Sequence, residues 1–228
     1  MRVQEEPLMK LNSVDISKTA SASSIVFEAL RKAIIEGDVK EGEPLRQDEI
    51  ARQFNTSRIP VREAISRLEE QGLVKTQRYK GAVVSGLSAD EAKEIFDFRA
   101  LIEPEVIRRA VPLMSQETLA TARDSWAAFS ASADPMSWGD LNREFHSTLY
   151  RASGLQYHLD VIDNAMDRVD RYLRAQLVLS NGMHRANEEH IAIWQACVEG
   201  NASGAAELTQ LHIADARDSL VENMNNLR

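Results

Sequence analysis

The sequence predicts a mainly α-helical protein in two parts, a small N-terminal domain and a C-terminal antiparallel bundle of six to seven helices. Apolar residues recur at helical spacing through most of the 228-residue chain. β-Branched residues on both sides of a tight turn predict one short hairpin at about residues 73–87, and no strand pattern follows residue 90. A chain of this length suits two modest domains better than one core.

Each element has its own signal. Residues 1–20 are polar and patternless, which predicts a flexible N-terminal arm. Three helices and the hairpin then fill a domain at 21–86, with residues 87–90 as a linker to an all-α domain at 91–228. The first helix ends at Gly37, because glycine just past the last periodic residue stops a helix. The bundle helices are expected at 90–111, 115–131, 136–152, 156–180, 183–199 and 202–227.

Composition excludes several classes of protein. No stretch approaches 18 consecutive apolar residues, so no membrane partner is expected. The N-terminus lacks the apolar segment of a secretory signal. The single cysteine, Cys197, excludes an intramolecular disulfide framework and fits a reducing compartment, so we expect a cytoplasmic protein.

The charge is unevenly distributed. The net charge is −8, which argues against general affinity for nucleic acid. Residues 1–86 carry 14 basic and 13 acidic residues, about +1, whereas residues 87–228 carry 13 and 22, which makes −9. A local basic region in the N-terminal domain therefore remains compatible with binding DNA.

The second and third predicted helices have helix-turn-helix spacing around Asn55-Thr56-Ser57, and the hairpin that follows makes the motif a winged one. In this arrangement the third helix enters the major groove. Arg58 and Arg62 lie in its first turns, where arginine can read guanine, and Ile59 faces outward toward a thymine methyl. The alternative is a solvated charged face. The residues expected to contact phosphates are Arg46, Ser57, Arg78 and Lys80.

The runs EALRKAIIEGDVKEGEPL and EIARQFNTSRIPVREAISRLEEQGLV closely resemble the N-terminal domain of GntR-family bacterial transcription regulators, over about residues 24–86. The resemblance implies double-stranded operator DNA as the partner. It implies DNA contacts at Arg46, Ser57, Arg58, Arg62 and the wing at Lys80-Gly81. Some relatives place a base-contacting arginine where this chain has Asp48, so their operator preference does not transfer.

The stretch LNREFHSTLY places Asn142 and His146 four residues apart, on the apolar side of a helix. A lone histidine there is best explained as a hydrogen-bonded core residue. However, His190 and His212 also point inward from two other predicted helices. Facing helices of a bundle build metal sites in this way, and imidazole suits zinc, nickel, copper or iron.

The second half resembles the all-helical effector domain, of the FCD type, found in the FadR-like branch of the GntR family. The metal-binding members have Asp-x3-His on one helix and two histidines about 21 residues apart on the last two. Asn142-x3-His146 and His190-x21-His212 match this pattern, with asparagine in the acid position. The resemblance therefore implies a metal site of Asn142, His146, His190 and His212. Zinc is the first expectation, with nickel, iron or manganese as alternatives.

Such domains sense small organic acids beside the metal, so the resemblance also implies a carboxylate effector. Arg99 occupies the place of an arginine that the family uses to clamp it. The alternative for Arg99 is an intrahelical pair with Glu103. Asn164 and Arg168 are weaker effector candidates, and a solvent-facing or dimer-facing stripe is the alternative there.

These expectations combine into a transcription regulator, a repressor that binds a pseudo-palindromic operator as a homodimer and releases or binds it according to the effector. The rival is a metal-dependent hydrolase-like enzyme. No carboxylate is placed beside the ligands as an obvious general base, and Asp215 is the nearest candidate. The DNA-binding domain would also have no role in such an enzyme. A third possibility is a regulator whose metal is purely structural.

Overall fold

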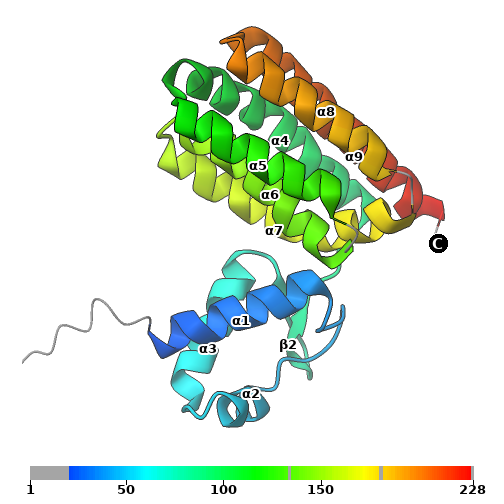
Figure 1. The fold of residues 1–228 in the computed structure, drawn as a ribbon. Helices are drawn as coiled ribbons and strands as arrows, with labels where there is room; N and C mark the ends of the chain where they lie inside the picture. Colours follow the sequence, from blue (N-terminus) through cyan, green and yellow to red (C-terminus); the bar gives the residue numbers. More distant parts are fainter. Residues whose placement is uncertain (1–20, 133–134, 180–181, 227–228) are drawn as a thin grey trace, which may run out of the picture.

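The computed structural model describes residues 21–132, 135–179 and 182–226, and the expected N-terminal arm at 1–20 lies outside them. The chain forms a small N-terminal part and a larger helical bundle joined by one short segment (Figure 1). The predicted fold class, a winged helix-turn-helix followed by an antiparallel helical bundle, is confirmed.

The N-terminal part contains helices α1 (Ala22–Glu36), α2 (Gln47–Gln53) and α3 (Arg58–Glu70), followed by strands β1 (Val74–Gln77) and β2 (Gly81–Val84). Gly37 ends α1 with a φ of 83°, as the sequence predicted. The two strands pair antiparallel, from Val74↔Val84 to Gln77↔Gly81. Val74 and Val84 are buried with the apolar faces of the three helices, so the hairpin is held against α3 and its turn projects outward.

The bundle contains six α-helices and one 3-10 turn among its described residues. They are α4 (Ala89–Ala110), η2 (Val111–Leu113), α5 (Gln116–Ala131), α6 (Pro135–Arg151), α7 (Gln156–Leu179), α8 (Gly182–Val198) and α9 (Ala202–Asn226). The predicted stripe residues Phe145 and Leu149 are fully buried, and the core around them contains residues of α4 to α9. The predicted helix boundaries that fall on described residues are within two residues of the observed ones, because the 3.6-residue period is strong. The predicted helix ends at residues 180 and 227 lie outside the described residues.

The segment expected as a linker is packed between the two parts. Leu87 is buried, and its backbone N–H donates to the Tyr172 hydroxyl of α7 at 2.8 Å. The Ser88 hydroxyl then accepts from the N–H of Glu91 and caps α4, which begins at Ala89. Helix α1 also contacts α7 directly, so the N-terminal part meets the bundle at more than one place.

None of the helices in the described ranges combines the length and the hydropathy that crossing a bilayer requires.

Candidate metal centre and DNA-reading surface

Three histidines from three helices meet inside the bundle. His146 of α6, His190 of α8 and His212 of α9 each offer a ring nitrogen, and these atoms all lie within 4.8 Å of one another. The centroids of the three rings are 4.8–5.0 Å apart. All three side chains are buried. The sequence prediction that these residues come together is therefore correct in geometry.

The electrostatics of the cluster suit a metal. Burial lowers the pKa of His146 well below its usual range, and the neighbouring His190 and His212 lower it further. The pKa of His190 is also lowered well below its usual range, mainly by burial and further by the neighbouring His212. Both imidazoles are therefore neutral and keep a free lone pair, which is the form that binds a metal.

Three ring nitrogens of the cluster lack protein partners. Nε2 of His146 and both ring nitrogens of His190 are buried without a hydrogen bond. Buried polar atoms without partners are costly, and most belong to sites that a water or an ion completes. Three convergent imidazoles with unsatisfied nitrogens are a ligand set that fits a transition metal.

Two neighbouring groups orient the histidines. Oε2 of Glu189 lies 2.7 Å from Nδ1 of His212, and the Tyr150 hydroxyl lies 3.4 Å from Nδ1 of His146. These contacts leave the Nε2 atoms of both rings for an ion. Asp215, the nearest candidate by sequence for the general base of the rival enzyme, is exposed, whereas Glu189, which the sequence did not single out, contacts a cluster histidine.

A small cavity adjoins the cluster. Its volume is about 50 Å³, and Asn142, Arg99 and His212 all contribute to its lining. Asn142, the expected fourth ligand, and Arg99, the expected effector clamp, therefore border the same cavity as His212. Arg99 also forms the pair that was its alternative role, because its Nε lies 2.6 Å from Oε1 of Glu103 and both side chains are buried. The Tyr150 hydroxyl donates to the same carboxylate at 2.9 Å, which ties the arginine to the cluster.

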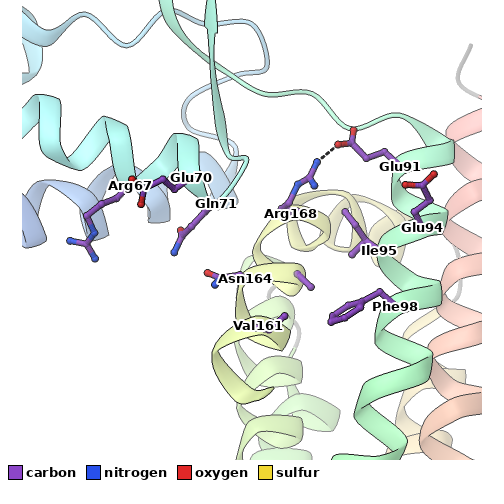
Figure 2. A pocket seen from close by; sticks show the side chains of 11 residues that line it. Arg67, Glu70, Gln71, Glu91, Glu94, Ile95, Phe98, Val161, Asn164 and Arg168 are labelled. Carbon is purple, nitrogen blue, oxygen red and sulfur yellow. Dashed lines mark hydrogen bonds and ion pairs between the residues drawn. The ribbon is translucent and has the colours of Figure 1, made fainter. Parts of the chain in front are cut away.

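Asn164 and Arg168 lie elsewhere. They line a wider cleft of about 660 Å³ that also takes in Arg67 and Gln71 of the N-terminal part, as Figure 2 shows. Arg168 points to Glu91 of α4 and forms an ion pair with it. This cleft and the cavity beside the histidines share no lining residue. The structure therefore does not bring Asn164 and Arg168 together with Arg99.

The reason lies in the orientation of α7. Ile162, Met166 and Val169 are its buried apolar residues. At about 100° per residue, positions 164 and 168 lie more than about 120° around the helix from this stripe, so they face away from the core and border the cleft between the two parts.

The candidate DNA-reading residues of α3 are exposed, as the sequence predicted. Arg58, Ile59 and Arg62 are exposed on the first turns of α3, and Ile59 is 59% exposed despite its apolar side chain. Arg58 pairs with Asp48 of α2. Exposed pairs of this kind contribute little, so the guanidinium can turn toward a base.

The expected phosphate contacts surround this helix. Ser57 is the N-cap residue of α3, and its hydroxyl accepts no hydrogen bond from the N–H groups of the helix. Arg46 is exposed at the start of α2 and pairs with Glu49 at 3.1 Å. Arg78, Lys80 and Gly81 are exposed at the hairpin turn, where the Arg78 guanidinium lies 4.9 Å from the Tyr79 ring centroid. Gly81 has a φ of 74°, which the tight turn requires.

Two family matches cover most of the described chain. Residues 22–84 match the family described as bacterial regulatory proteins, gntR family, and residues 94–215 match the FCD domain. The chain belongs to the GntR family. It is therefore a DNA-binding transcription regulator with an FCD domain, and the enzyme alternative is set aside.

Individual relatives agree with this membership. The chain is 27% identical over 224 residues to the HTH-type transcriptional regulator BphR of Paraburkholderia xenovorans, covering 94% of this chain and 91% of BphR. It is 23% identical over 208 residues to the HTH-type transcriptional repressor RspR of Escherichia coli, covering 90% and 91%. The solved structure of E. coli McbR/YncC has the same fold, with a TM-score of 0.78 at 18% identity over 92% of this chain and 99% of that one.

Proposed function

We propose that this regulator senses a small organic acid beside a metal ion held by His146, His190, His212 and Asn142, and that the acid controls its affinity for operator DNA. The observation that carries the proposal is the convergence of three buried imidazoles whose ring nitrogens lie within 4.8 Å of one another. Some of these nitrogens have no protein partner.

The metal supplies a Lewis-acid position that accepts a carboxylate or hydroxyl oxygen. Three imidazoles and one amide oxygen suit zinc first, with nickel, iron or manganese as alternatives. Four protein ligands alone would make a closed, structural zinc site, so a sensing role needs a fifth position to which the coordination can expand. The cavity lined by Asn142 and His212 favours an open position, and therefore a sensing role.

The effector is small. The cavity of about 50 Å³ is far below the roughly 300–1,000 Å³ of drug-sized ligand sites. Arg99 lines it, and its guanidinium has five N–H donors of which two contact Glu103. A short-chain acid whose carboxylate reaches the metal and Arg99 together therefore fits the charge of the lining.

The DNA-binding part acts in the cytoplasm on a pseudo-palindromic operator, with α3 in the major groove and the hairpin turn against phosphates. Two half-sites require a homodimer. An apolar side of α4 supports this assembly, because Ile95 and Phe98 are only partly buried and Leu101 is 74% exposed. The named activity of RspR favours a repressor.

A carboxylate screen tests the proposal. The metal-loaded protein and the same protein after chelation are screened by thermal shift against a library of small carboxylic acids. We expect at least one acid to stabilise the loaded form only and to change the affinity for operator DNA. An acid that stabilises both forms equally, or a loaded protein that responds to none, would contradict a metal-assisted effector site. Turnover of an added acid is the control for the hydrolase alternative.

A further inference from the structure

One buried carboxylate joins the DNA-binding part to the metal-bearing bundle. Asp167 of α7 accepts from Nε and from Nη2 of Arg31 on α1, both at 2.5 Å. The Asp167 side chain is 1% exposed, so this two-pronged contact is shielded from water. This buried contact therefore differs from an exposed surface ion pair, which contributes little to holding two parts together.

A guanidinium on a third helix forms an ion pair with the same carboxylate. Nη2 of Arg143, on α6, lies 2.9 Å from Oδ1 of Asp167. Burial raises the pKa of Asp167, and the two guanidinium groups oppose this rise by stabilising its charge. The carboxylate therefore depends on α1 and α6 at once, and we name Arg31, Asp167 and Arg143 the interdomain triad.

Both bundle helices of the triad also line the cavity beside the histidines. On α6, Asn142 lines the cavity, and its chain neighbour Arg143 reaches Asp167. On α7, Asp170 lines the cavity one turn beyond Asp167. Asp170 is itself buried, so two buried acids of α7, one helical turn apart, lie between the cavity and Arg31.

A second cavity continues this path to α1. Its volume is about 300 Å³, and its lining includes Asp170 and Arg143 of the bundle together with Arg31 of α1. Asp170 thus borders both the space beside the histidines and the space against the DNA-binding part. A shift of α6 or α7 at the metal reaches α1 without passing through the segment at residues 87–90.

We propose that the interdomain triad couples the metal site to the DNA-binding part. The inference rests on the proposed metal site. An ion at His146 and Asn142 fixes α6, and α6 together with α7 then fixes Asp167 and the position of α1. Arg31 and Arg143 are positioning residues that touch neither the ion nor DNA. Ligand binding at one site can affect the other only through such an element with differing contacts in the two states.

Hydrogen exchange of the full-length protein tests the coupling, with Zn²⁺ alone as the probe. Metal content and the exchange of peptides from residues 22–36 are measured in the same samples, with and without a chelator. In the wild type we expect zinc to slow exchange in α1 about fivefold or more, at the lower end of common coupling factors. In Arg31→Gln we expect equal zinc content but less than about a twofold effect on α1.

Three further variants sharpen the test. Asp167→Asn removes the charge at the centre of the triad and should behave like Arg31→Gln, which folds more safely because Arg31 is partly exposed. Arg31→Lys keeps the charge and should restore part of the response. Tyr172→Phe is the matched control, because it removes the hydroxyl contacts to Leu87 and Glu41 and leaves the triad in place.

The outcomes separate the two proposals. A wild type that binds no zinc overturns the metal site and the coupling together. A wild type that binds zinc with no change in α1 overturns the coupling alone. A response in Arg31→Gln and Asp167→Asn as large as in the wild type also overturns the coupling alone, as would a loss of response in Tyr172→Phe equal to that of Arg31→Gln.

Discussion

Oε2 of Glu189 lies 2.7 Å from Nδ1 of His212, so a carboxylate on α8 holds a ring on α9 with its Nε2 toward the other histidines. A partner of this kind fixes the tautomer and orientation of a ligating imidazole and raises its basicity. Glu189 therefore belongs to the proposed metal site, although it need not touch the ion.

Glu189→Gln should weaken zinc binding. The amide cannot supply the negative charge that stabilises the ring, and loss of such a partner typically lowers metal affinity about 10–100-fold. Competition with a chelator of known affinity measures the change. Glu188→Gln is the control, because Glu188 is exposed and lies near the exposed His184 instead. Equal affinities for the two variants would contradict the orienting role.

Asn142→Asp should tighten zinc binding, by about tenfold or about 1.4 kcal/mol. The substitution is nearly isosteric and adds a negative charge beside a divalent cation. Asn142→Ala, which removes the oxygen, should weaken binding. The same chelator competition reports both. If neither variant differs from the wild type, Asn142 is not a ligand.

Metal-free protein should lose stability as the pH falls below about 6.5. The folded-state pKa of His190 is lowered, so the unfolded chain binds a proton that the folded chain excludes, and stability declines from the unfolded pKa down to the folded one. Each such histidine contributes a slope of up to about 1.4 kcal/mol per pH unit. Urea unfolding between pH 7 and 5 should show a shallower slope in His190→Gln.

The exposed His158 provides the control for this pH series. His158→Gln should keep the slope of the wild type. A His190→Gln slope equal to that of the wild type would contradict the burial of a neutral imidazole at this position.

Arg62→Ala should weaken operator binding and relax specificity at one base pair. A bidentate contact to guanine gives about 1–3 kcal/mol of discrimination. Fluorescence anisotropy with a duplex selected from a random library by the protein itself measures both quantities. Arg123→Ala is the matched control, since Arg123 is an exposed arginine on α5 of the bundle. Similar losses in both variants would show only an effect of net charge.

The sequence predicts the fold well because its helices are long and strongly periodic, and because Gly37 and the turn before Ser57 mark clear boundaries. It also predicts the convergence of His146, His190 and His212, since inward positions on packed helices share one core. These parts depend on local pattern and on family spacing.

Contacts between side chains of different helices could not be predicted in this way. Glu189 follows an acidic residue in the run EEH, and nothing local indicates that it faces His212. The link between Arg31 and Asp167 spans 136 positions and depends on how α1 docks on α7. Asn164 and Arg168 belong to a stripe on the long helix α7, and only packing decides which side of that helix meets the histidines.

The most direct test of the account is a crystal structure of the zinc-loaded protein with anomalous data collected at the zinc edge. We expect one strong peak inside the bundle, about 2.0–2.1 Å from one ring nitrogen of each of His146, His190 and His212. A map without a peak among these three rings, at full zinc loading of the crystal, would contradict the metal site and the sensing role built on it.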